Sequence, residues 1–471
     1  MTEPHRFFLS HLRHEPEELR AFFAELAPSA KVLLTYAREL PECYRRLEAQ
    51  FECVELVNLF AFRERKFALD VWKKIESILE SIFTDPSTPL IWERGKTSAK
   101  GGLLDLAIGR KQSFLKGSAE IANEVIFFHQ FFEATKPTFL LFGFTPHSIT
   151  SWIRMKVAQQ MGIPTLVINR CGVDGFYRIA ERYERNEKNL QIGSVNDKEA
   201  AIHEERLNLI VKNTLSSYTE AQPDYERIRF EQSRGDYVRL SHIVRQHWYA
   251  PGRAINTFRC WRQLERSSRS LNDIKNCKYA IFFLHYQPEA TSVPNGDLFG
   301  SQLNAILALR STLPKDVKLL VKEHPATFMI ACHGIARDPE FYARISSLPN
   351  VEFIDIQTDN FELIDSSILT ATISGTVGRE ALIRGAPTVF FGKSFLDSSQ
   401  GCFNYQESSG FRDFIQTVAN GGFSRKHISE QAIAAMDSQR SNAFFSRTSS
   451  ENELMLDGLR TIMHRGVSFD R

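Results

Sequence analysis

Short apolar segments alternate with amphipathic segments along most of this chain, and this alternation constrains the fold more than any other feature. In the first part, the segments at 31–36, 51–59, 136–144 and 163–168 have the length and composition of buried strands. Helical periodicity fills the intervals, for example around residues 66–83. Strands that alternate with helices at this spacing predict a parallel, doubly wound sheet.

A second alternation of the same kind begins at KYAIFFL, near residue 278. Its helices are expected in the segments LFGSQLNAILALRSTL, PEFYARISSL and VGREALIRG. Its strands are predicted at 278–284, 317–323, 351–355, 368–373 and 387–392. A second parallel sheet is therefore expected.

The chain has 471 residues, of which 43% are hydrophobic, and this length favours two or three domains. We predict an α/β protein with two Rossmann-like domains, residues 1–182 and 276–424, that face each other across a cleft. Residues 183–275 are charged and helical in pattern, which predicts a helical insertion and linker. Residues 425–471 are polar and helical in pattern, and no strand is expected there.

Bulk composition excludes several classes of protein. Lys and Arg total 58 against 56 Asp and Glu, so a net charge of +2 gives no reason to expect a nucleic-acid partner. Seven scattered cysteines without a zinc-type spacing suit a reducing cytoplasm. The N-terminus is too charged for a signal peptide, and the apolar runs are too short to cross a bilayer. We expect a cytoplasmic protein, and peripheral association with the inner face of the cell membrane stays open.

Polar loops follow three strands of the second alternation, and open parallel sheets bind ligands beyond the carboxyl ends of their strands. The first loop, LHYQPEATSVP, contains His285, Gln287, Pro288 and Glu289. The Gln287 amide is suited to recognise a base or a sugar. A proline-bounded strand exit that binds nothing explains this loop equally well.

The second loop, KEHPAT, places a histidine directly after a strand. Pro325 restricts the backbone of His324, so we predict a rigid imidazole that donates a hydrogen bond or a proton to a leaving phosphate. Lys322 and Glu323 are further binding candidates, although they alternate across the strand and have an ordinary alternative as partners of helices. A lone histidine is more often structural. A functional role for His324 is favoured because the glycine loop described next is expected at the same edge of the sheet.

The third loop, SGTVG, joins a strand to a helix that should end at Gly385. The N-terminus of that helix suits a phosphate or a carboxylate. Ser374 and Thr376 add hydroxyl donors, while Gly375 and Gly378 permit close backbone approach or a positive φ. The alternative is a tight turn in which Ser or Thr caps the helix.

In this order and spacing, LHYQPEAT, KEHP and SGTVGREALIRGAPTVFFG resemble the bacterial capsule and lipopolysaccharide biosynthesis glycosyltransferases, which include the capsule Kdo transferases. More distantly, they are similar to the polysialyltransferases, which share the His-Pro motif. The resemblance covers residues 278–395, and the N-terminal half fits only in layout. It implies a GT-B fold whose C-terminal domain holds a nucleotide-sugar, typically a CMP-activated sugar such as CMP-Kdo.

The resemblance also implies roles for individual residues. His324 corresponds to the His-Pro histidine and would contact the nucleotide phosphate. Ser374, Gly375 and Thr376 correspond to the turn that would hold phosphate or cytidine groups. Glu380 would bind a ribose hydroxyl.

Two further points concern the donor pocket of that family. Gln287 and Pro288 correspond to its Gln-Pro loop. The stretch GKSFLDSS, from residue 392, lacks the tyrosine expected near the family's FG-x-x-F-Y ending.

The chemistry expected here needs neither a metal nor a cofactor. The sequence contains no Asp-x-Asp motif, the metal anchor of the other major glycosyltransferase fold. A helix N-terminus, hydroxyl groups and a histidine would instead stabilise the departing phosphate. We expect a nucleotide-sugar as co-substrate and no metal site.

The acceptor and a nucleophile or base are expected from the N-terminal domain. Candidates that follow its strands are Glu39, His147 and Asp174. Each has an ordinary alternative as a helix cap or a turn residue. The arginine-rich segment 234–269 could meet an anionic glycolipid or polysaccharide acceptor, and a solvated helical face explains it too.

The sequence thus predicts a metal-independent enzyme that transfers a sugar, such as Kdo, from a nucleotide-sugar to a surface polysaccharide or glycolipid. One alternative is a phosphotransferase that uses a CDP-polyol. Another is a non-catalytic nucleotide-binding module of a polysaccharide assembly complex, and a nucleotide-sugar 2-epimerase is also conceivable on this architecture.

Overall fold

The computed structural model divides into two compact units. The first comprises Met1–Thr88, Phe114–Ala200 and Gln439–Arg471, and the second comprises Pro89–Ser113 and Ala201–Ser438. The residues that the structure describes are 5–10, 30–36, 45–46, 50, 54–58, 69–85, 87–89, 91, 114–181, 188–221, 251–274, 277–285, 287, 291–328, 337–394, 396, 400–405, 410–447 and 451–464.

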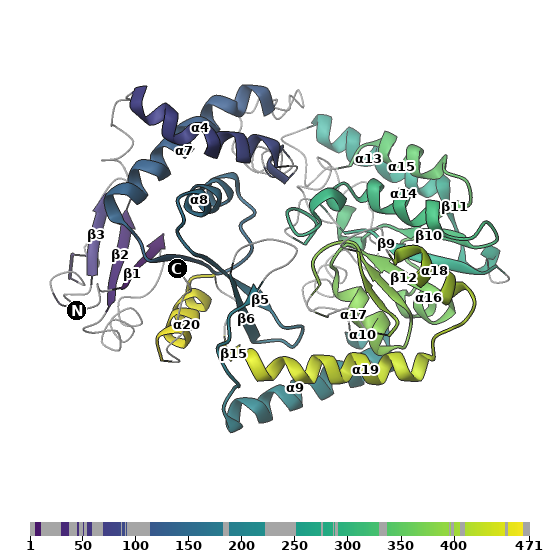
Figure 1. The fold of residues 1–471 in the computed structure, drawn as a ribbon. Coiled ribbons are helices and arrows are strands. Elements are labelled where there is room, and N and C mark those ends of the chain that lie inside the picture. The colour runs from purple at the N-terminus through teal and green to yellow at the C-terminus, as the bar shows by residue number, and fades with distance from the viewer. Residues whose placement is uncertain are drawn as a thin grey trace. The chain divides into compact units, whose positions relative to one another are not determined.

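The sheet of the second unit is parallel throughout, in the order β14-β13-β12-β9-β10-β11-β8. From β9 the chain first adds β10 and β11 on one side and then β12, β13 and β14 on the other, so the strand order reverses between β9 and β12 (Figure 1). The strands are β8 (Ser268–Arg269), β9 (Tyr279–Phe283), β10 (Lys318–Lys322), β11 (Val351–Ile354), β12 (Leu369–Thr372), β13 (Thr388–Phe390) and β14 (Cys402–Asn404).

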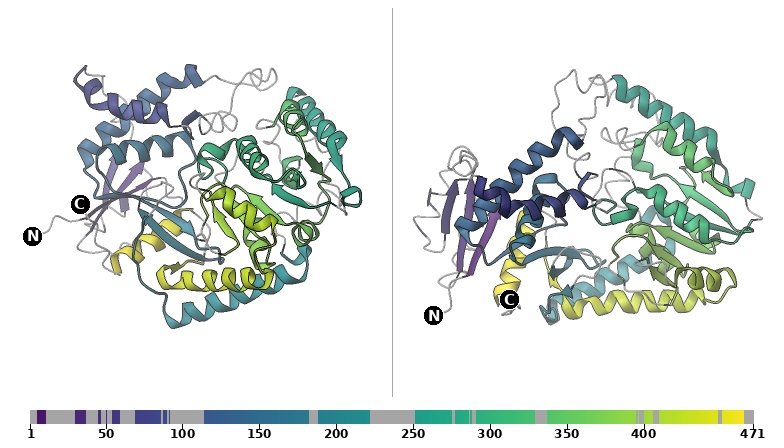
Figure 2. Two further views of the ribbon diagram at one scale, coloured as in Figure 1. Left: turned by 45° about the vertical axis from the view of Figure 1, so that its right-hand side comes forward. Right: turned by 45° about the horizontal axis from the view of Figure 1, so that its top comes forward.

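Helices cover both faces of this sheet (Figure 2). Alternate residues of a strand point to opposite faces, so Ala280 and Phe282 pack with α13, α14, α15 and α18, whereas Tyr279 and Ile281 pack with α16 and α17. The described helices are α9 (Asp197–Ser216), α10 (Tyr218–Ala221), α13 (Pro251–Ser267), α14 (Gln302–Thr312), α15 (Pro339–Ser346), α16 (Asn360–Ser366), α17 (Thr376–Ile383), α18 (Phe411–Ala419) and α19 (Arg425–Ser438), with short 3-10 helices η1 (Leu271–Ile274), η2 (Asp297–Gly300) and η3 (Pro325–Phe328). Every residue of β9 is buried, as expected for a strand covered on both faces.

Two long helices, α9 and α19, lie side by side in all three views (Figures 1 and 2). Nδ1 of the fully buried His203 on α9 lies 3.9 Å from a carboxylate oxygen of Asp437 on α19. Within residues 183–275 the structure describes the helices α9, α10 and α13 and also the short strands β7 and β8.

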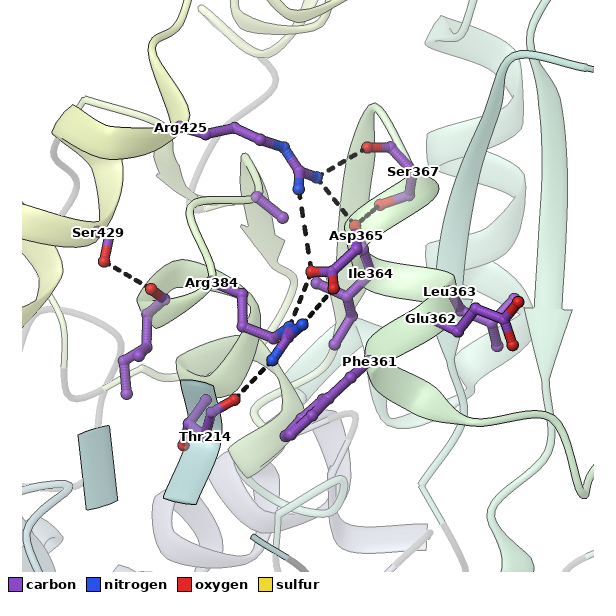
Figure 3. Close-up of polar contacts among 12 residues, drawn as sticks. Thr214, Phe361, Glu362, Leu363, Ile364, Asp365, Ser367, Arg384, Arg425 and Ser429 are labelled. Carbon is purple, nitrogen blue, oxygen red and sulfur yellow. Dashed lines mark hydrogen bonds and ion pairs between the residues drawn. The ribbon is translucent and has the colours of Figure 1, made fainter. Parts of the chain in front are cut away.

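Two arginines connect these helices to the α/β core (Figure 3). Arg384, at the end of α17, pairs with Asp365 of α16 and donates to the carbonyl oxygen of Thr214 on α9 at 2.7 Å. Arg425, the first residue of α19, donates to the carbonyl oxygen of Ile364 at 2.9 Å. Helix ends leave carbonyl groups without intrahelical partners, and the two guanidinium groups satisfy these acceptors.

The first unit has a related sheet, in the order β15-β6-β5-β4-β1-β2-β3, with β7 paired to β6. Strands β1 to β5 are parallel, whereas β6, β7 and β15 run antiparallel to their neighbours. The order β3-β2-β1-β4-β5 matches β11-β10-β9-β12-β13 of the second unit, so both units are Rossmann-like and the predicted α/β class is confirmed. The elements are β1 (His5–Ser10), β2 (Ala30–Tyr36), β3 (Val54–Asn58), β4 (Phe139–Phe142), β5 (Thr165–Arg170), β6 (Phe176–Glu181), β7 (Lys188–Asn189), β15 (Phe444–Phe445), α4 (Leu69–Thr84), α7 (Phe114–Thr135), α8 (Ile149–Gln160) and α20 (Glu451–His464).

Every strand predicted from an apolar run is present, as β2 to β5 and β9 to β13. The expectation of no strand after residue 425 was wrong, because β15 pairs antiparallel with β6. Strand β1 was not predicted, although it lies between β2 and β4. Both strands owe their conformation to pairing with segments distant in sequence, which local composition does not report.

None of the helices in the described part of the chain is both long enough and apolar enough to cross a membrane.

Candidate active site

The carboxyl ends of β9, β10 and β12 lie at one edge of the second sheet, with β9 between the other two. His285 follows β9, His324 follows β10 and Ser374 follows β12. In open α/β sheets the crevice forms where the strand order reverses, which here is between β9 and β12. The loops that precede and follow this point therefore form the candidate site.

The imidazole of His285 joins the loops after β9 and β12. The backbone N–H of Ser374 donates to Nε2 at 3.2 Å, and the hydroxyl of Thr291 lies 3.2 Å from Nδ1. An N–H group can only donate, so Nε2 is an acceptor and Nδ1 holds the proton that bonds Thr291. The hydroxyl of Thr372 lies 3.0 Å from Nε2 as well. A buried imidazole thus joins the loops that border the crevice.

The backbone of His285 is held as firmly as its ring. The side-chain amide of Gln302 accepts from the N–H of His285 at 2.8 Å and donates to its carbonyl oxygen at 3.0 Å. Arg337 donates to the same carbonyl oxygen at 2.9 Å. Sequence reasoning did not identify the roles of His285, Gln302, Arg337 or Thr291, because no local motif distinguishes them.

A buried ion pair holds the loop that follows β10. Arg337 Nε donates to Glu323 Oε2 at 3.0 Å, and the Tyr342 hydroxyl donates to the same oxygen at 2.7 Å. Glu323 Oε1 accepts from the N–H of His324 at 2.8 Å and from the hydroxyl of Thr327 at 3.1 Å. Burial opposes ionisation, but the Arg337 charge and these donors hold the pKa of Glu323 below its usual value. The carboxylate of Glu323, a predicted ligand of the nucleotide, thus bonds protein groups and positions His324.

His324 itself is half-buried and precedes η3, where its carbonyl oxygen accepts from the N–H of Thr327 at 2.9 Å. Pro325 opens η3 and is buried. The buried ammonium group of Lys322 instead bonds the carbonyl oxygen of Thr358 and the amide oxygen of Asn360, beyond β11. His324 is thus more exposed than Lys322 and Pro325, the other two candidates of this loop described here.

The N-terminus of α17 has no side-chain cap in the described structure. Its N-cap residue is Gly375, and the hydroxyl of Ser374 donates to the carbonyl oxygen of Thr291 at 2.5 Å instead of capping the helix. Thr376, the first residue of the helix, is exposed. The alternative of a Ser or Thr cap is therefore wrong, and the partial positive charge of this helix end is left for another acceptor.

The glycines of the third loop serve close packing and not a positive φ. Gly375 has φ of −73°, and a Cβ placed on it would lie 3.1 Å from His285 Cε1. Gly378 lies inside α17, where a Cβ would lie 2.3 Å from Cε1 of Phe390 on β13. The left-handed φ of 78° belongs to Gly385, which follows the end of α17 as predicted.

We expect Gly378→Ala to destabilise the protein by about 1–3 kcal/mol, since the new methyl group would force α17 away from the Phe390 ring. Urea unfolding would measure the change. In a Gly378→Ala background, Phe390→Leu should recover part of the loss by making room for the methyl group. Equal stability of Gly378→Ala and the unchanged protein would contradict the packing.

The remaining candidates of the second unit are turned toward the protein or lie outside the described residues. The side-chain amide of Gln287 donates to the carbonyl oxygen of Gly300 at 2.9 Å, which closes its own loop. Glu380 is buried within α17. Pro288 and Glu289 lie outside the described residues.

In the first unit, Asp174 and His147 follow the carboxyl ends of β5 and β4. Asp174 is exposed in the turn that leads into β6, flanked by Gly172 and Gly175, both with positive φ. Nδ1 of His147 lies 2.8 Å from the carbonyl oxygen of Thr145. Glu39 lies outside the described residues.

The described residues contain no group of three or more His, Cys, Asp and Glu side chains arranged to hold a metal ion.

Neither a protein-family model nor a curated protein matches the chain. Among solved structures, the chain is similar to the Thermosulfurimonas dismutans KpsC β-Kdo 2,4 transferase, with 13% identity, a TM-score of 0.32, and coverage of 68% of this chain and 79% of that one. It is also similar to Anabaena Alr3699/HepE in complex with UDP and glucose, with 10% identity, a TM-score of 0.28, and coverage of 99% and 100%. A third is the UDP-GlcNAc 2-epimerase of Neisseria meningitidis, with 11% identity, a TM-score of 0.23, and coverage of 98% and 99%. Likeness at this level does not identify a shared reaction, so the site itself must support any function.

Proposed function

We propose that this protein is a glycosyltransferase that binds a nucleotide-sugar, with CMP as the nucleotide, in the crevice between β9 and β12. The observation that carries the proposal is the uncapped N-terminus of α17 at the point where the strand order reverses. Helix N-termini in this position bind phosphate groups. The hydrogen bonds among His285, Ser374 and Thr291 hold the surrounding loops in place before a ligand binds.

In the proposed reaction, a base takes the proton of an acceptor hydroxyl, the hydroxyl oxygen attacks the anomeric carbon of the donor sugar, and the bond from that carbon to the phosphate oxygen breaks. Negative charge then develops on the departing phosphate. The N–H groups of the first turn of α17 and the hydroxyl of Thr376 would stabilise this charge. His324 would donate a hydrogen bond or a proton to the leaving oxygen.

The acceptor in this proposal is a surface polysaccharide or a glycolipid, and Asp174 is a candidate base or nucleophile from the first unit. The reaction would require no metal ion and would take place in the cytoplasm, at or near the inner face of the membrane.

A panel of CMP, CDP, UDP, GDP and ADP tests the donor site through the melting temperature. We expect CMP to raise the melting temperature most, because a ligand that binds only the native state adds about 2.7 kcal/mol of stability at 100 times its Kd. Thr376→Ala should reduce the CMP effect without lowering the melting temperature of the free protein. Ser311→Ala, which removes an exposed helix hydroxyl on α14, is the matched control and should leave the CMP effect intact.

Other results of the nucleotide panel, or of an analysis of the product, would contradict the proposed donor, site or reaction. A rise with UDP and not with CMP would show that the donor nucleotide is wrong. No rise with any nucleotide would overturn the proposed site. A phosphodiester in the product of turnover would identify transfer of a polyol phosphate in place of a sugar.

A further inference from the structure

Helix α13 exposes a row of arginines on one side. Ile255, Arg259, Arg262 and Arg266 are exposed and follow one another at spacings of four, three and four residues, and Arg269 of β8 continues the series. With about 100° of rotation per residue, the four positions on α13 fall within about 60° of arc. The α-helical part of the row is about 16 Å long at 1.5 Å per residue. The row is therefore narrow, continuous and cationic.

Among the described residues, no carboxylate forms an ion pair with the arginines of this row. In the described part of the chain, the guanidinium groups of Arg259 and Arg266 have no ion pair or hydrogen bond, and Arg262 stacks over Phe258 at 5.9 Å. Glu265 is exposed on the flank of the row, and its carboxylate pairs with none of these arginines.

Acidic residues of the adjacent α15 are used elsewhere. Asp338 caps α15 by accepting from the N–H of Phe341 at 2.7 Å. Glu340 pairs with Arg344 on its own helix. Uncompensated cations on one line attract a partner with repeated negative charge.

The row begins at the edge of the sheet that contains the candidate site. Asn256, in the first turns of α13, donates to the carbonyl oxygen of Arg337 at 3.0 Å, and Arg337 donates to the carbonyl oxygen of His285. The other end of α13 leads directly into β8, which is parallel to β11 and pairs with its last two residues, Phe353 and Ile354. The row thus starts near the residues that hold the site and follows α13 to the edge strand β8.

The chemistry of α13 favours a polymer over a lipid surface. Its apolar side, with Cys260 and Leu264, is buried against the sheet and α15, so it is not available to insert into a bilayer. Membrane-surface helices bury a broad apolar face in the lipid, whereas among the described side chains of α13 the exposed large hydrophobic one is Ile255. A row one side chain wide matches a single extended chain.

We propose that the arginine row Arg259, Arg262, Arg266 and Arg269 binds an anionic polysaccharide, namely the carboxylate-bearing acceptor on which the enzyme acts. This inference rests on the proposed glycosyl transfer and specifies its acceptor as a polyanion. The row holds the part of the acceptor that lies away from the reacting end.

Binding of polygalacturonate, a linear polymer of uronic acid, tests the row, with neutral dextran as the comparison. The row variant Arg259→Glu/Arg262→Glu/Arg266→Glu should bind polygalacturonate at least about tenfold more weakly at low salt, and its binding should depend less steeply on salt. The control variant Lys212→Glu/Lys315→Glu/Arg412→Glu changes the net charge equally at exposed sites outside α13, and it should bind as the unchanged protein does. Replacing the three row arginines with lysine should retain most of the binding.

Equal loss in the row and control variants would overturn the proposal, because net charge alone would then explain binding. Unchanged binding by the row variant would overturn it too. If the row variant loses binding to vesicles of phosphatidylcholine and phosphatidylglycerol while polygalacturonate binding is unaffected, the row is a membrane contact and the proposal is wrong. The nucleotide panel does not involve α13, so failure of the donor site and failure of the acceptor row are distinguishable.

Discussion

Replacing Arg337 with methionine should lower the free energy of unfolding by about 3–5 kcal/mol, because it leaves the buried carboxylate of Glu323 without its cation. Both side chains are buried, and Arg337 also holds the carbonyl oxygen of His285. Urea unfolding monitored by circular dichroism would measure the loss. The matched control is Arg344→Met on α15, since its pair with Glu340 is exposed and should contribute at most about 1 kcal/mol. Similar losses in the two variants would contradict the buried pair.

The same pair makes the effect depend on pH. The folded pKa of Glu323 is below its usual value, so its contribution is fully present above that usual value and is lost as the pH falls through the folded value. The difference between the unchanged protein and Arg337→Met should therefore be largest near neutral pH and should shrink in acid. A difference that grows as the pH falls would contradict the assignment.

His324→Ala should reduce turnover by about one to three orders of magnitude without unfolding the protein, in line with the loss of a group that stabilises the departing phosphate. The side chain is half-buried, and the N–H of residue 324 would still donate to Glu323, so the loop should keep its backbone. Release of CMP from the CMP-sugar measures turnover, and the melting temperature reports folding.

The matched control is His427→Ala, which removes another half-buried histidine of the second unit, on α19. This variant should keep its turnover. Unchanged turnover in His324→Ala would remove the imidazole from the mechanism. A large fall in melting temperature would instead assign His324 a structural role.

The effects expected for Arg337→Met and His324→Ala therefore distinguish the roles of two neighbouring residues, Glu323 and His324. Glu323 faces the protein and holds the backbone of His324, so disrupting its ion pair should lower the free energy of unfolding. The His324 imidazole is proposed to act on the leaving group, so removing it should lower turnover.

Much of the second unit followed from local pattern. Strands β9 to β13 are short apolar runs between polar turns, and Gly385 ends α17 with a positive φ. These features depend on residues near one another in the chain, so composition and spacing were sufficient to predict them. The order of polar loops after β9, β10 and β12 was predictable for the same reason.

Contacts between distant segments decided which of those polar residues are available to a ligand. His285 is bonded by Gln302 and Arg337, 17 and 52 residues away, and by Ser374, 89 residues away. Strand β15 likewise forms only by pairing with β6. No local motif encodes such partners, so the sequence pattern alone placed Lys322, Glu323 and Thr376 among the binding candidates.

The chain's periodicity was enough to predict two α/β sheets and the edge at which a ligand is proposed to bind, because strand and helix patterns are local. Tertiary packing alone assigned Lys322 and Glu323 to buried bonds and left Thr376 exposed beside an uncapped helix end. The physical reason is that a buried polar group must find a partner, and the fold determines which distant residue provides it.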